Sequence, residues 1–128
     1  MSAFLRFAMV GAAGFVVNEA ALWAALHLLY LGKDVAWFAA FVPSVTFTWW
    51  GNRTFTFREH ASIGAKAMFR EWAHFVLTNN LGALINLAVY ELLIHFTVIG
   101  PLLALACGVL AGMMFNFTLS KRLVFRPK

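Results

Sequence analysis

The sequence FAMVGAAGFVVNEAALWAALHLLYLG at residues 7–32 reappears in altered form as FVLTNNLGALINLAVYELLIHFTVIG at residues 75–100, at a constant offset of 68 residues. The match continues without a gap to residues 58 and 126. Self-similarity at a fixed offset is the signature of a repeated structural unit. We therefore predict two copies of one unit, residues 7–58 and 75–126. Their identical positions include Gly14 and Gly82, Asn18 and Asn86, His27 and His95, Gly32 and Gly100, and Phe57 and Phe125.

The composition indicates that lipid surrounds much of this chain. Of its 128 residues, 62% are hydrophobic and only 12% are charged, which is too little polar surface for a water-soluble globule. About 20 apolar residues cross a bilayer as a helix. Runs of about that length lie at residues 7–31, 35–52, 74–99 and 101–119. We therefore expect an all-α membrane protein in which residues 1–128 form a single domain of four transmembrane helices.

Basic residues are distributed unevenly around these four runs. Lys33 alone follows the first run, whereas every other lysine and arginine precedes it, lies between the second and third runs, or follows the fourth. Because positive charge concentrates on the cytoplasmic side of a membrane, we expect both termini in the cytoplasm and a multi-pass protein of the cytoplasmic (inner) membrane. The two hairpins then form a parallel, pseudo-symmetric repeat rather than an inverted one. Topology accounts for the net charge of +5, and no nucleic-acid partner is expected.

The second helix of each repeat carries small or short side chains at every fourth position. Small residues at this spacing let helix backbones approach closely within lipid, so we interpret both stripes as packing faces. The sequence leaves open whether the partner helix belongs to the same chain or to a second copy. The stripes are Ala36, Ala40, Ser44 and Thr48 in the first repeat and Ala104, Gly108, Gly112 and Asn116 in the second.

Polar side chains lie on the first helix of each repeat, near the expected middle of the membrane. A carboxylate at that depth costs about a few kcal/mol unless it is protonated or partnered, so Glu19 must face protein or water. We interpret these residues as a polar seam for a polar cargo, and hydrogen bonding between helices is the alternative. The members of the seam are Asn18, Glu19, Asn79, Asn80 and Asn86.

Glu91 and His95 stand four residues apart on the third helix, so their side chains can meet and share a proton. His27, the counterpart of His95, follows Trp23 instead of a carboxylate. A pair present in one repeat is more typical of a local polar contact than of a relay. Proton coupling through Glu19, Glu91 and His95 is therefore one of two interpretations.

Each repeat ends in a basic and aromatic tail, NRTFTFR at residues 52–58 and NFTLSKRLVFR at residues 116–126. Alternation of apolar and polar residues predicts extended segments that lie along the membrane interface with their cations exposed. Since arginine donates hydrogen bonds in a fork that suits phosphate, we predict a site for a phosphate or lipid headgroup. General attraction to anionic lipid is the alternative. The residues assigned to this site are Arg6, Asn52, Arg53, Arg58, Asn116, Lys121 and Arg122.

These features resemble the GtrA-like family of small four-helix membrane proteins, and the resemblance spans nearly the whole chain. It rests on the opening RFxxVG at residues 6–11, the NRxFTF tail at residues 52–57 and the second tail that starts with NF at residues 116–117. The resemblance implies translocation of polyprenyl-phosphate-linked sugars across the cytoplasmic membrane, for cell-surface polysaccharide synthesis or envelope glycosylation. It implicates Arg6, Gly11, Asn18, Asn52, Arg53, Phe57, Asn116, Arg122 and Phe125.

The second copy departs further from the family pattern than the first. Phe55 and Leu123 stand where a tryptophan is common in the tails, and His74 stands where the first repeat has Arg6. Equal roles for the two tails therefore do not follow from the resemblance.

Flipping of a polyprenyl-phosphate-linked sugar is the expected function, with the phosphate held by Arg53, Arg122 and Arg6 and the sugar passing along the polar seam. Two other classes remain open. One is a membrane anchor or activating partner of a polyprenyl-phosphate glycosyltransferase, docked through residues 51–71. The other is a small proton-coupled multidrug exporter.

Besides the lipid-linked sugar, the expected partners are membrane lipids, a glycosyltransferase and a second copy of the chain. The sequence shows no nucleophile paired with a base, no cluster of metal ligands and no glycine-rich nucleotide loop. Neither catalytic residues nor a metal or cofactor are therefore expected.

Overall fold

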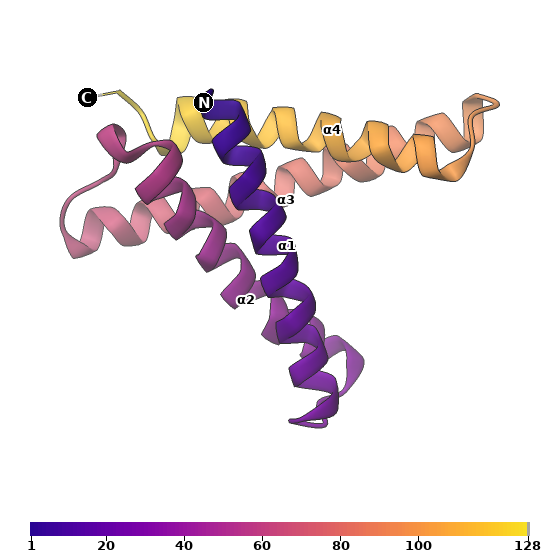
Figure 1. Ribbon diagram of the computed structural model, residues 1–128, viewed down its shortest axis with the longest axis horizontal. Helices are drawn as coiled ribbons and strands as arrows, with labels where there is room; N and C mark the ends of the chain where they lie inside the picture. The colour runs from indigo at the N-terminus through magenta and orange to yellow at the C-terminus, as the bar shows by residue number, and fades with distance from the viewer. Residues whose placement is uncertain (128) are drawn as a thin grey trace. The chain divides into compact units, whose positions relative to one another are not determined.

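The computed structural model describes residues 1–127, and Lys128, one of the expected cytoplasmic cations, lies outside the described residues. The chain divides into two compact units, Met1–Ala61 and Ser62–Lys128. Each unit is a helical hairpin (Figure 1), as expected for the all-α class. The first hairpin contains α1 (Ala3–His27), α2 (Lys33–Gly51), a π-helical turn (Asn52–Thr56) and a 3₁₀ turn (Arg58–His60). The second contains α3 (Ala65–Phe96), α4 (Pro101–Leu119) and a π-helical turn (Ser120–Val124).

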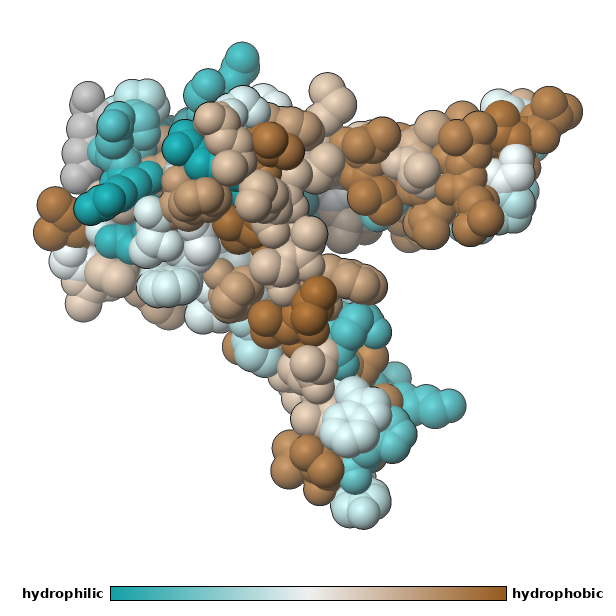
Figure 2. Space-filling model, viewed as in Figure 1, coloured by the Kyte–Doolittle hydropathy of each residue, from teal (hydrophilic) through white to brown (hydrophobic). Residues whose placement is uncertain are grey.

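Within residues 1–127, three helices are long and apolar enough to cross a membrane, namely α1, α3, and α4 together with its π-helical turn. Large hydrophobic side chains on the second hairpin are exposed, among them Phe96 at 81% and Leu102 at 84%. Figure 2 shows hydrophobic side chains over much of the visible surface of the α3–α4 hairpin. Apolar surface of this extent is unfavourable in water and favourable in lipid. The chain is therefore a membrane protein with several apolar helices.

The predicted second span, residues 35–52, is helical as α2 but is not one of these three. Its 19 residues rise about 28 Å, close to the roughly 30 Å hydrocarbon core. Pro43, Ser44, two threonines and three tryptophans lower its hydropathy. The length of α2 therefore suits a crossing, whereas its composition suits a helix that contacts protein and the interface as well as lipid.

The ends of α1 differ from the predicted range of 7–31. The helix begins at Ala3, because Ser2 caps it by accepting a hydrogen bond from the Leu5 N–H at 3.1 Å. It ends at His27, before the predicted Leu31. Tyr30 has a φ of 54°, a left-handed backbone conformation that an α-helix does not contain, so the chain turns before Leu31.

Helix α3 begins at Ala65, well before the predicted residue 74, and runs for 32 residues. A helix of that length is about 48 Å long, longer than the roughly 30 Å hydrocarbon core, so part of it extends beyond the membrane. The Glu71 carboxylate, only 3% exposed, accepts a hydrogen bond from the Ser62 N–H at 2.7 Å. This contact folds the segment before Gly64 back onto the helix. Residues 65–71, which were expected to lie between the second and third spans, belong to α3.

The small-residue stripe of α2 packs against α1 of the same hairpin, which answers the question that the sequence left open. Ser44 Oγ donates a hydrogen bond to the Gly14 carbonyl oxygen at 2.9 Å. A Cβ on Gly14 would overlap the Thr48 side chain, and Ala36 and Ala40 are almost completely buried. Close backbones joined by an interhelical hydrogen bond are a typical packing mode in lipid.

The stripe of α4 packs against α3 in the same register. A Cβ on Gly112 would lie 2.7 Å from the Gly82 carbonyl oxygen, and one on Gly108 would lie 2.6 Å from the Asn86 carbonyl oxygen. Gly82 itself lies against Asn116. Since Gly82 and Gly112 correspond to Gly14 and Ser44 at the sequence offset, the repeat in the sequence is also a repeat in the packing.

The prediction of extended tails is wrong. After α2, the Phe57 N–H donates to the Asn52 carbonyl oxygen at 2.8 Å, and after α4 the Phe125 N–H donates to the Ser120 carbonyl oxygen at 2.8 Å. Both are bonds between residues five apart, so the chain continues as a π-helical turn. Near lipid, backbone groups are best satisfied within the segment, and these turns do so where an extended tail would not.

A pair of phenylalanines anchors each π-helical turn to the first helix of its hairpin. Phe57 meets Phe7 with ring centroids 6.3 Å apart, and Phe125 meets Phe75 at 6.2 Å, both edge-on at 62°. All four rings are buried. Apolar residues of the tails therefore alternate with polar ones because some pack inside the hairpin, not because the tail is extended.

Substituting Gly112→Ala tests the close approach of α3 and α4. The added methyl meets backbone at Gly82, which cannot rotate away, so we expect a destabilisation of about 1–3 kcal/mol. Gly11→Ala is the matched control, because a Cβ there meets nothing within 4 Å. Thermal unfolding in detergent micelles measures both, and equal melting temperatures for the two variants would contradict this packing.

Removal of the Phe125 ring tests the anchoring of the second π-helical turn. Phe125 is 1% exposed, and truncating a buried phenylalanine costs about 3–5 kcal/mol, so Phe125→Ala should unfold at a markedly lower denaturant concentration. Phe96→Ala, at an 81% exposed position, serves as the control. If Phe125→Ala unfolded at the same denaturant concentration as Phe96→Ala, the Phe125 ring would not anchor the turn.

Candidate functional site

The end of the first hairpin that carries its π-helical turn holds two arginines against aromatic rings. The guanidinium carbon of Arg6, from the start of α1, lies 5.9 Å from the centroid of Phe55. That of Arg53 lies 5.7 Å from the centroid of Trp49, one turn earlier. Cation–π contacts at these distances stabilise and orient the cations. The structure thus places two of the predicted headgroup residues beside one turn.

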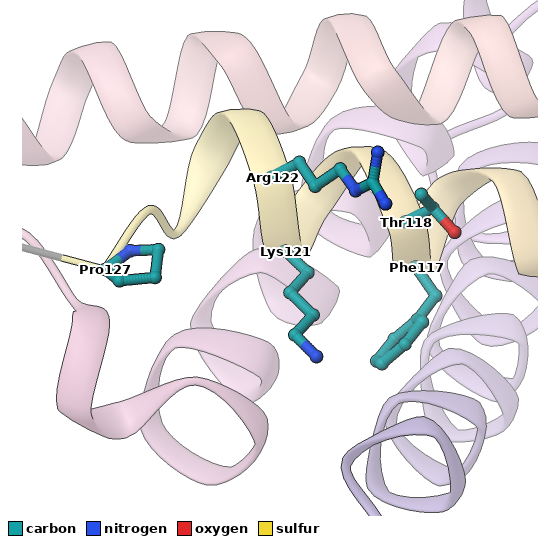
Figure 3. A pocket seen from close by; sticks show the side chains of 5 residues that line it. All are labelled: Phe117, Thr118, Lys121, Arg122 and Pro127. Atoms are coloured by element: carbon teal, nitrogen blue, oxygen red, sulfur yellow. The ribbon is translucent and has the colours of Figure 1, made fainter.

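The same end of the second hairpin contains an open hollow of about 530 Å³ lined by Phe117, Thr118, Lys121, Arg122 and Pro127. Figure 3 shows the Lys121 ammonium and the Phe117 ring projecting to the same side, with the Arg122 guanidinium extended toward Thr118. Lys121 and Arg122 are exposed. Two predicted headgroup residues therefore share one concave surface.

The sequence offset pairs these two ends residue by residue. Arg53 corresponds to Lys121 and Trp49 corresponds to Phe117, so each repeat places an aromatic residue four positions before a cation. The predicted site lacked both aromatic residues, although this shared spacing was a signal that could have identified them. Arg122 corresponds to Thr54, and only the second hairpin has adjacent cations at this turn.

The two asparagines assigned to the headgroup site lie inside their hairpins. Asn52 is 1% exposed, and its Oδ1 accepts a hydrogen bond from the Thr56 hydroxyl at 2.8 Å. Asn116 packs against Gly82, and its Oδ1 is buried without a hydrogen-bond partner. Asn52 therefore helps to build the first π-helical turn, whereas Asn116 packs where α3 meets α4. Arg58 is exposed at the start of the 3₁₀ turn.

The residues of the predicted polar seam differ in their surroundings. Glu19 is exposed on its hairpin and Asn18 is half-buried. Asn79 Nδ2 donates to the Phe75 carbonyl oxygen at 3.2 Å, and Asn80 Nδ2 donates to the Val76 carbonyl oxygen at 3.0 Å. These two amides thus bond to their own helix.

Asn86 lies where α3 meets α4. It contacts Gly108 and Gly112 and also lines a smaller hollow of about 210 Å³ together with Ala83, Leu87, Tyr90 and Leu105. Helix packing is therefore one use of its side chain, and lining an open surface is another.

Glu91 and His95 meet as their spacing predicts, with Oε2 and Nε2 3.0 Å apart and both side chains exposed. In the first repeat, the His27 ring stacks on Trp23 at 5.2 Å, and its Nδ1 lies 3.0 Å from the Trp23 carbonyl oxygen. Among the described residues, no three histidine, cysteine or acidic side chains form a group that could hold a metal ion.

The chain has no match among curated proteins. A family model described as GtrA/DPMS, transmembrane domain, matches residues 6–125. The match covers both hairpins and both π-helical turns, and it confirms the resemblance noted in the sequence. This chain belongs to the GtrA/DPMS transmembrane-domain family.

Proposed function

We propose that this protein flips a polyprenyl-phosphate-linked sugar across the cytoplasmic membrane, with four helices crossing as two parallel hairpins and both chain ends in the cytoplasm. The family is linked to the handling of lipid-linked sugars. The observation that carries the proposal is the matching end of each hairpin, where a cation and an aromatic ring stand one turn apart. Such an end suits a headgroup that combines a phosphate with a sugar.

Charge within each hairpin supports the proposed orientation. In the first hairpin, Arg6, Arg53 and Arg58 lie at the end where the chain enters and leaves, and Lys33 lies at the connecting turn. In the second hairpin, the connecting segment 97–100 carries no lysine or arginine. Since positive charge is retained in the cytoplasm, the ends with the π-helical turns would face that side.

The chemistry of phosphate binding favours these residues over general attraction to lipid. Arginine and lysine form charge-assisted hydrogen bonds with phosphate oxygens, and these bonds are stronger than those between neutral groups. Arg6 and Arg53 are held against rings, so less side-chain freedom is lost when a phosphate binds. A cation that is already positioned binds more specifically than one that is free in the interface.

Polar groups on α1 and α3 would reduce the cost of moving a sugar past hydrocarbon. Glu19 is exposed on its hairpin, and Asn80 is exposed on α3. The polyprenyl tail can stay in lipid, so only the headgroup requires polar partners during the crossing. In this proposal, Glu91 and His95 at the other end of α3 are the candidates for proton coupling.

A docking role for a glycosyltransferase is the second candidate, and one observation favours it. The start of α3 extends beyond the hydrocarbon core, and near it Ile63 and Phe69 are 84% and 68% exposed. Lys66 and Arg70, also exposed, share the helix face of Phe69. Exposed apolar side chains rimmed by charge are typical of protein interfaces.

Reconstitution of the purified chain into proteoliposomes with a labelled polyprenyl-phosphate hexose tests the first candidate. Arg53→Ala and Lys121→Ala each remove a charge-assisted hydrogen bond, so each should slow flipping by about tenfold or more. Lys33→Ala, at the opposite end of the first hairpin, should leave the rate unchanged. A wild-type chain that moves no lipid in this assay, or equal rates in all three variants, would contradict the proposal.

Co-purification of a glycosyltransferase with the tagged chain tests the second candidate. Phe69→Ser removes an exposed apolar side chain from the proposed docking face, so the enzyme should no longer co-purify while flipping continues. Val98→Ser, at a fully exposed position near the other end of α3, is the matched control. Retention of the enzyme by Phe69→Ser would exclude this face as its binding surface.

A further inference from the structure

We infer that the hollow of the second hairpin is the subsite that recognises the sugar, with a glycosyl phosphate bound so that its phosphate meets Lys121 and Arg122 and its sugar ring lies on Phe117. This inference rests on the proposed function and assigns the two parts of the headgroup to separate side chains. The hollow brings together, within one hairpin, a pair of cations, a hydroxyl and an aromatic ring.

Two cations in one hollow select an anion. Lys121 and Arg122 are both exposed, so a phosphate can replace their water without being buried. Their donors differ in form, because arginine offers a planar fork and lysine a compact ammonium. A phosphate diester with two free oxygens has an acceptor for each of them.

The hydroxyl of Thr118 supplies an acceptor for a sugar. Its proton is already used, since Thr118 Oγ1 donates to the Met114 carbonyl oxygen at 2.8 Å. The lone pairs of Oγ1 therefore remain to accept a hydrogen bond. A sugar hydroxyl is such a donor, whereas a phosphate without bound protons is not.

The Phe117 ring supplies the flat apolar surface that a pyranose requires. Figure 3 shows this ring beside the Lys121 side chain at the wall of the hollow. One face of a pyranose presents mainly C–H groups, and an aromatic ring buries such a face with little loss of side-chain freedom. The volume of about 530 Å³ falls within the roughly 300–1,000 Å³ typical of small-molecule sites.

The first hairpin offers a different arrangement at the corresponding positions. Its ring, Trp49, is already contacted by the Arg53 guanidinium at 5.7 Å, and Thr54 replaces the second cation. Thr54 Oγ1 donates to the Trp50 carbonyl oxygen at 2.7 Å. With one cation at this turn and Trp50 in the place of the Thr118 hydroxyl, the first hairpin suits a phosphate alone, and the sugar is read by the second.

Calorimetric binding to the full chain in detergent tests this assignment with four probes: inorganic phosphate, glucose 1-phosphate, citronellyl phosphate and citronellyl phosphoglucose. We expect citronellyl phosphoglucose to bind most tightly. Phe117→Ala and Phe117→Leu should remove the advantage that the sugar confers, about two- to tenfold, and should leave the affinity for citronellyl phosphate unchanged. Lys121→Ala should weaken binding of both prenyl probes by about tenfold.

Trp49→Ala is the matched variant from the first hairpin and should retain the sugar advantage. Loss of that advantage in Trp49→Ala but not in Phe117→Ala or Phe117→Leu would overturn this inference, while flipping in proteoliposomes would still support the proposed function. Binding of glucose 1-phosphate as tightly as citronellyl phosphoglucose would overturn the assignment to a lipid headgroup. Melting temperatures of all variants confirm that each is folded before affinities are compared.

Discussion

Close contact between two helix backbones inside each hairpin is the constraint on which the other features depend. In lipid there is little hydrophobic force to hold apolar helices together, so packing and short polar contacts must do so. Ser44 bonds to the carbonyl of Gly14, and Gly112 rests on the carbonyl of Gly82. This spacing brings the end of the second helix beside the start of the first, where the phenylalanine pairs can form.

The π-helical turns that follow these helix pairs differ in their side-chain hydrogen bonds. In the first, Thr56 donates to Asn52 and closes the π-helical turn. In the second, Val124 stands in place of Thr56 and cannot donate, and the buried Ser120 Oγ has no hydrogen-bond partner. A buried polar group without a partner costs about 1–3 kcal/mol. The π-helical turn of the second hairpin is therefore less completely satisfied than that of the first.

Prediction from the sequence succeeded where a residue type at a given spacing has only one physical explanation. Alanine and glycine at every fourth position marked the faces where helices meet, and the spacing of Glu91 and His95 marked a contact that forms. The prediction of extended tails failed because alternation of polar and apolar residues does not distinguish a strand-like segment from a widened helical turn. Trp49 was overlooked because a tryptophan near a membrane boundary has a sufficient explanation as an anchor, and Phe117 was interpreted only as part of the start of the second tail.

The sequence by itself determined the class, the repeat and the family, because apolar content, a constant offset and residues 6–125 are properties of the linear chain. It also determined which end of each hairpin is basic. Only the tertiary structure decided that the stripes pack within a hairpin, that both tails wind into π-helical turns, and that Phe117, Thr118, Lys121 and Arg122 line one hollow. The reason is that a pattern specifies which side chains share a face, whereas the partner of that face is set by the path of the whole chain.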